Sequence, residues 1–144
     1  MKRLIVLSGP QAAGKSTSIN KLFQLLQHIY PCFPGSKDVV PAILQEARQI
    51  VVHKHHAMGA IFLTEKEEKE IIDIDFLRMN KILQELDESL LYLDECNIFT
   101  LAHAKAHGVD LVDEYLPKYV KLLKELHAVI IFLDIPPEVS WERR

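Results

Sequence analysis

RLIVLSGPQAAGKS, residues 3–16, is the stretch of the sequence that says most about its fold. Its first part, Arg3–Ser8, is apolar at successive positions and rich in branched side chains, as in a strand buried on both faces of a parallel sheet. After a turn from Gly9 to Gly14, apolar residues recur at helical spacing from Ile19 to about His28. A strand, a glycine-bounded turn and a helix in this order favour an α/β fold.

The turn matches the pattern G-x-x-x-x-G-K-[ST] at each of its fixed positions. The two glycines let successive N–H groups point at phosphate oxygens, and the helix that follows directs its positive dipole end at the same anion. Lys15 offers a compact positive charge to the β- and γ-phosphates, and Ser16 offers a hydroxyl to Mg²⁺. The motif therefore predicts a site for ATP and Mg²⁺, formed by Gly9, Pro10, Gln11, Ala12, Ala13, Gly14, Lys15, Ser16 and Thr17.

The remaining periodicities predict further strands and helices in alternation. Crossovers of this length favour parallel strands, so we expect a three-layer α/β/α sandwich of the P-loop NTP hydrolase type, as one domain over residues 1–144. Thr64–Glu67 has the form of a capping box. The predicted loop spans 31–38, the strands span 89–93 and 128–134, and the helices span about 41–56, 64–86, 98–107 and 111–127; 59–63 reads as a strand or a connector.

The composition argues against several classes of protein. The formal net charge is −3 with 26% charged residues, which gives no sign of binding to nucleic acid or to a membrane surface. The apolar run near the start is too short for a secretory signal or a membrane span. Cys32 and Cys96 are far apart and have no neighbouring Cys or His at metal-ligand spacing, so we expect reduced thiols and a cytoplasmic protein. The sequence leaves the oligomeric state open, a homodimer included.

Two acidic residues end the predicted strand 89–93. Asp94 stands where a parallel-sheet nucleotide site needs a carboxylate near the metal, either to orient a Mg²⁺-bound water or to accept a proton from an attacking hydroxyl. Glu95 is a second candidate for this role. The alternative is purely structural, because Asp94 or Asn97 could cap the helix that begins near Ile98.

Three blocks of the sequence resemble the thymidylate kinase and deoxynucleoside kinase branch of the P-loop kinases. They are the phosphate loop, SLLYLDECNIFTLAHAKAHG (89–108) and AVIIFLDIPPEVSWERR (128–144). Members of this branch have an acid at the end of a middle strand and a later L-D-x-P-P-E segment that leads into an arginine-bearing lid. The resemblance implies transfer of the γ-phosphoryl group of ATP to a nucleoside or nucleoside monophosphate.

The resemblance also implies roles for particular residues. Lys15, Asp94 and Arg143 would be catalytic, with Arg143 at the start of the lid, and Ser16 and Asp94 would lie at the metal. The segment Phe33–Ser36 looks like the acceptor-side E-P-G-G segment, and Phe76 has core packing as its alternative role. The expected acceptor-side residues are Phe33, Gly35, Phe76, Arg78 and Glu95.

The sequence departs from this family pattern in two places. Glu95 replaces the arginine expected after the acid, and the pair Asp94–Glu95 resembles the acid pair of many P-loop ATPases. An ATPase or nucleotide-dependent switch without a small acceptor is therefore the alternative function. Family members also continue beyond the position of Arg144 with the lid, another strand and an adenine-binding loop, so we expect either that the chain is truncated or that the protein lacks these parts.

Overall fold

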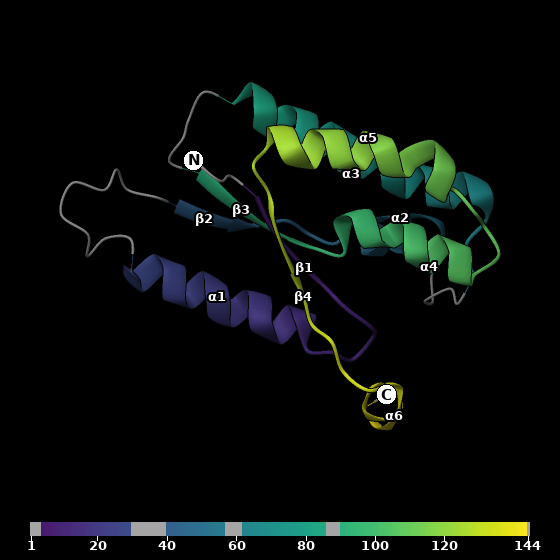
Figure 1. Cartoon of the computed structure of the whole chain (residues 1–144), viewed down its shortest axis with the longest axis horizontal. Coiled ribbons are helices and arrows are strands. Elements are labelled where there is room, and N and C mark those ends of the chain that lie inside the picture. Colours follow the sequence, from purple (N-terminus) through teal and green to yellow (C-terminus); the bar gives the residue numbers. More distant parts are fainter. Residues whose placement is uncertain (1–3, 30–39, 57–61, 86–89, 144) are drawn as a thin grey trace. The chain divides into compact units, whose positions relative to one another are not determined.

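The computed structural model describes residues 4–29, 40–56, 62–85 and 90–143 (Figure 1). It is an α/β structure in which contacts divide the chain into two compact units. The first unit comprises Met1–Leu44, Leu86–Cys96 and His127–Arg144, and the second comprises Gln45–Glu85 and Asn97–Leu126. Each unit is described by itself below.

The first unit is built on a parallel sheet. In the described ranges the sheet has four strands in the order β2-β3-β1-β4, and each neighbouring pair is parallel. This confirms the prediction of an α/β structure with a parallel sheet. The strands are β1 (Leu4–Ser8), β2 (Val40–Ile43), β3 (Leu90–Glu95) and β4 (Val129–Phe132).

Helix α1 (Lys15–Ile29) packs on one face of this sheet. Its buried residue Ile19 lies in a cluster with Leu7 of β1 and Leu93 of β3. Side chains alternate between the faces of a strand, so every second residue counted from Leu7 and Leu93 faces α1. The partly buried residues that complete this cluster are Ile5, Leu22, Phe23, Leu26 and Leu133.

The predicted helix at 41–56 is wrong over its first residues. Pro41 lies in β2, paired with Leu91 of β3, and helix α2 (Ala47–His55) begins six residues later. A proline suits the first turn of a helix, but it is also tolerated on an edge strand, where its missing N–H removes no ladder bond. β2 is an edge strand of the sheet that the structure describes, so pairing with β3 overrode the local helical signal.

The second unit is helical in its described part. Helices α2 and α3 (Glu65–Gln84) pack around a core that includes Val51 and Ile71. The predicted capping box is confirmed: Glu67 N–H donates to the Thr64 hydroxyl, and the Glu67 carboxylate accepts from the Thr64 N–H at 2.7 Å. The other helical elements in the described part of this unit are the 3₁₀ turn η2 (Asn97–Phe99), α4 (Thr100–Ala106) and α5 (Val112–Glu125).

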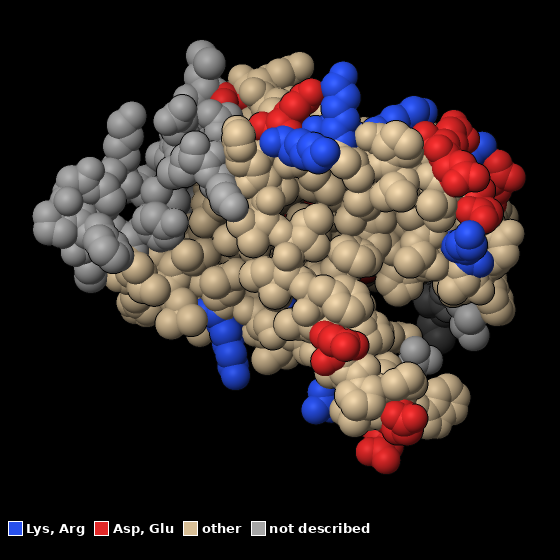
Figure 2. Space-filling model, in the orientation of Figure 1, with Lys and Arg blue, Asp and Glu red and all other residues tan. Residues whose placement is uncertain are grey.

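Polar side chains also join the helices of this unit. Arg48 forms a two-pronged bond to buried Glu68, with N···O distances of 2.9 and 2.6 Å, and it donates to the Thr100 hydroxyl. The Tyr119 hydroxyl donates to buried Asp75 at 2.6 Å. On the face drawn in Figure 2, basic and acidic side chains are interspersed. Within the ranges described above, no helix is both long and apolar enough to cross a bilayer.

Candidate functional site

The turn between β1 and α1 has the backbone that its glycines permit. Gly9 has a φ of +151°, and Gly14 has a φ of +85°. A Cβ atom at Gly9 would lie 2.4 Å from the carbonyl oxygen of Leu133, whereas a Cβ at Gly14 would meet nothing within 4 Å. Gly9 is therefore needed for close approach to the chain that follows β4, and Gly14 is needed for its dihedral angle.

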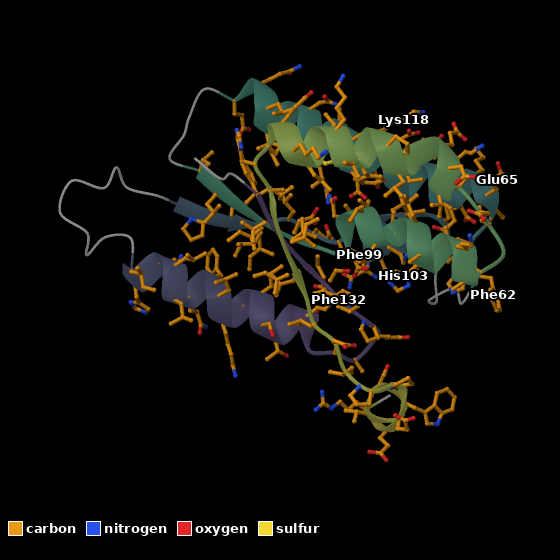
Figure 3. All side chains as sticks on the ribbon, in the orientation of Figure 1. Phe62, Glu65, Phe99, His103, Lys118 and Phe132 are labelled. Carbon is orange, nitrogen blue, oxygen red and sulfur yellow. The ribbon has the colours of Figure 1, made fainter. Side chains whose placement is uncertain are left out.

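Two main-chain bonds attach the strands beside this turn. The Leu133 N–H donates to the Ser8 carbonyl at 2.7 Å, and the Cys96 N–H donates to the Leu7 carbonyl at 3.1 Å. Phe132, labelled in Figure 3, is the last residue of β4 and directly precedes Leu133. The residues after β3 and after β4 are thus held at the carboxyl ends of the strands, where the turn begins.

Lys15 is the first residue of α1, and its side chain folds back over the turn. Its Nζ donates to the carbonyl oxygens of Gly9 and Pro10 at 3.2 and 3.0 Å. The ammonium group is therefore held against the backbone of the turn, the location in which the motif requires a positive charge. Thr17, two residues further along α1, is exposed.

Ser16 meets Glu95, the last residue of β3. The hydroxyl oxygen of Ser16 lies 3.1 and 3.0 Å from the two carboxylate oxygens of Glu95. Alternation along β3 explains this contact, because Glu95 is two residues beyond Leu93, which packs under α1. The structure thus joins the serine of the motif to the acid that was only the second candidate in the sequence.

Asp94 occupies the opposite face of β3 from Glu95 by the same alternation. It is 2% exposed, and its Oδ1 accepts the N–H of Glu95 at 2.9 Å. The cap predicted near Ile98 is not formed: Asn97 lies within the 3₁₀ turn η2 and accepts the neighbouring Ile98 N–H at 2.8 Å, and the N-cap of α4 is Phe99, without a side-chain hydrogen bond. The prediction that Asp94 lies at the metal and acts in catalysis stays a prediction.

Helix α6 (Pro137–Glu142) brings a residue to the turn that the sequence did not indicate. The hydroxyl of Ser140 donates to the main-chain carbonyl of Gln11 at 2.6 Å, and Ser140 is 5% exposed. No motif marks a lone serine 129 positions away from its partner, so this contact had no signal in the sequence. Arg143 caps the C-terminus of the same helix and is exposed.

Of the expected acceptor-side residues, the structure describes Glu95, Phe76 and Arg78. Phe33 and Gly35 lie outside the described residues. Phe76 and Arg78 lie on α3 in the second unit, where the Phe76 ring packs 4.7 Å from that of Tyr119 between centroids. One terminal nitrogen of Arg78 is buried without a hydrogen-bond partner. Phe76 is half-buried, and the contact of its ring with the buried Tyr119 is packing within this unit.

The Ser16–Glu95 pair places a hydroxyl and a carboxylate side by side, and both are oxygen groups of the kind that can bind Mg²⁺. Mg²⁺ prefers hard oxygen ligands and keeps several of its waters, so one hydroxyl and one carboxylate suit it. Among the described residues, no group of three or more His, Cys, Asp or Glu side chains could hold a metal by itself. The histidines at the end of α2 pair with acids instead: His55 with Glu70 and His56 with Glu67, each at 2.7 Å.

Comparison with known proteins adds no family assignment. No model of a known protein family matches the sequence, and a search of curated proteins finds no significant match.

Proposed function

We propose that this protein binds MgATP at the turn between β1 and α1 and transfers its γ-phosphoryl group to a small acceptor, a nucleoside or a nucleoside monophosphate. The observation that carries the proposal is the contact of Ser16 with Glu95 at 3.0 Å, next to a complete G-x-x-x-x-G-K-S turn. The parallel sheet supports it, since ligands of such sheets bind beyond the carboxyl ends of the strands. A three-layer sandwich of the P-loop type is the corresponding fold proposal.

Each residue has a defined task in this proposal. The amides of the turn would bind phosphate oxygens, and Lys15 would leave the carbonyls of Gly9 and Pro10 to reach the β- and γ-phosphates. Ser16 and Glu95 would hold the hydrated metal between them. Bound Mg²⁺ would supply charge neutralisation at the phosphates. Arg143 would add positive charge at the transferred group, and Asp94 is the proposed acceptor of the proton from the attacking hydroxyl.

The test is a phosphorylation screen. The protein is incubated with Mg²⁺, γ-labelled ATP and separate nucleosides and nucleoside monophosphates, and the label is followed into the acceptor. We expect labelled product with one acceptor class, and none from Lys15→Ala. A wild-type protein that binds MgATP but labels no acceptor would contradict the kinase proposal.

An ATPase or nucleotide-dependent switch is the second candidate. Glu95 favours this candidate, because it replaces the arginine that the kinase resemblance leads us to expect. Its carboxylate also contacts the Ser16 hydroxyl, where an acid could bind a metal ion or orient a water molecule. This candidate predicts phosphate release from MgATP without any acceptor, and loss of that release in Glu95→Gln. Release that depends strictly on an acceptor would exclude it.

A further inference from the structure

The segment Pro10–Ala13 of the phosphate turn is itself a tight turn with an unusual residue in it. The Ala13 N–H donates to the Pro10 carbonyl at 3.2 Å, which closes a four-residue β-turn. Ala12, its third residue, has a φ of +60°, while Gln11, its second, is not among the described residues with positive φ. A left-handed residue at the third position alone is the type II pattern, which normally requires glycine.

This conformation has an accessible competitor. A type I turn uses the same end-to-end bond but has negative φ at both central residues, and it is the commoner turn for side chains such as alanine. The two types differ by rotation of the peptide between Gln11 and Ala12. Rotation would relieve the left-handed conformation of Ala12, which L-residues other than glycine, asparagine and aspartate seldom adopt. The sequence of the turn alone therefore favours the rotated peptide.

Ser140 acts on this same peptide. Its hydroxyl donates to the Gln11 carbonyl at 2.6 Å, and that carbonyl belongs to the peptide that would rotate. The peptide is trans, so its carbonyl and the Ala12 N–H point in opposite directions. While Ser140 holds the carbonyl, the Ala12 N–H points away from α6. Rotation would break the hydrogen bond from Ser140 to the Gln11 carbonyl. It would also exchange the positions of this carbonyl and the Ala12 N–H, so that a hydrogen-bond acceptor would replace a donor in the proposed phosphate-binding turn.

We propose that Ser140 is a positioning residue that keeps the Gln11–Ala12 peptide in its anion-binding orientation, so that the Ala12 N–H is available to a phosphate oxygen. Ser140 touches neither nucleotide nor metal and acts only through the loop. The inference rests on the proposed function, because it assigns the turn to phosphate. The inference adds to the proposed function a way in which helix α6 determines the affinity for the nucleotide.

The experiment compares dissociation constants for MgATP by titration calorimetry. We expect Ser140→Ala to weaken binding about tenfold, which corresponds to about 1.4 kcal/mol. Glycine adopts positive φ freely, so Ala12→Gly in the Ser140→Ala background should restore binding to within about threefold of wild type. This rescue is the decisive readout, because a glycine in the loop cannot repair a helix that has lost its packing.

Val139→Ala is the matched control, since it trims α6 next to Ser140 and keeps the hydroxyl. It should bind MgATP as wild type does. The inference is overturned if Ser140→Ala binds as tightly as wild type, if Ala12→Gly restores nothing, or if Val139→Ala weakens binding as much as Ser140→Ala. Failure of the proposed function looks different: the wild-type protein itself would not bind MgATP.

Discussion

The hydroxyl of Ser16 and the carboxylate of Glu95 lie 3.0 Å apart at their closest, although 79 positions separate the two residues in the chain. Ser16 is in the first turn of α1, and Glu95 ends β3 on the face that α1 covers. A strand-end carboxylate and a helix-start hydroxyl are thus brought to one point next to the phosphate turn.

The first prediction concerns the metal. Ser16→Ala and Glu95→Gln should each raise the Mg²⁺ concentration that half-saturates ATP binding, by roughly tenfold, because each removes one oxygen ligand or its charge. The double variant should be little worse than either single one, since residues that hold the same group are not additive. Mg²⁺ titrations at fixed ATP measure this. Glu138→Gln, an exposed acid on α6, is the control.

Asp94→Asn separates the two acids of β3. If Glu95 serves the metal, Asp94→Asn keeps the wild-type Mg²⁺ requirement for ATP binding and loses only turnover. A shifted Mg²⁺ requirement in Asp94→Asn, with none in Glu95→Gln, would return the metal to Asp94 and contradict the assignment made from the Ser16 contact.

The second prediction concerns Gly9. Gly9→Ala places a Cβ 2.4 Å from the Leu133 carbonyl, so the chain after β4 must move. We expect a loss of about 2 kcal/mol in the free energy of unfolding, as for overpacked sites. Gly108→Ala is the comparison, because Gly108 has a φ of +87° and open space around it. It should lose about 1 kcal/mol, the cost of the left-handed conformation alone. If urea unfolding gave equal losses of unfolding free energy for Gly9→Ala and Gly108→Ala, this would contradict the close approach of Gly9 to the Leu133 carbonyl.

The third prediction is a pH dependence at the capping box of α3. Hydrogen bonds from the Thr64 backbone N–H, then from its hydroxyl, with a smaller effect of His56, lower the pKa of Glu67 to about 2. A lowered pKa stabilises the fold above the ordinary value of 4.5, and this stabilisation is lost as the pH falls from 4.5 through 2. Glu67→Gln should therefore unfold at a lower temperature than wild type at pH 7, with the difference closing at acid pH.

Thermal unfolding followed by circular dichroism between pH 7 and 2 measures this difference. Glu125→Gln, an exposed acid near the end of α5, should run parallel to wild type over the whole range. If the difference in unfolding temperature between Glu67→Gln and wild type stayed constant down to pH 2, the charged Glu67 carboxylate would not be the group that stabilises the capping box.

The sequence was most informative where the chemistry is local. The strand, glycine turn and helix of residues 3–29 and the capping box at Thr64 depend on neighbours in the chain, so their patterns could be read directly. The edge strand β2 could not, because Pro41 is compatible both with a helix start and with an edge strand, and its partner β3 lies about 50 residues away.

The same distinction holds within the candidate site. The sequence placed an acid at the end of β3 but gave Asp94 precedence over Glu95, since the face toward α1 depends on the register of Leu93 against Leu7 and Ile19. Ser140 carried no signal, because its role depends on one main-chain carbonyl in a distant loop.

The last prediction concerns the turn from Gly9 to Ser16, which we propose to be a triphosphate site. ATP is titrated calorimetrically into wild-type protein and into Lys15→Ala, with and without Mg²⁺. We expect Mg²⁺-dependent binding to the wild type and at least a hundredfold loss, about 2.7 kcal/mol, in a Lys15→Ala protein that keeps its circular dichroism spectrum. Equal affinity of the two folded proteins for MgATP would contradict the account.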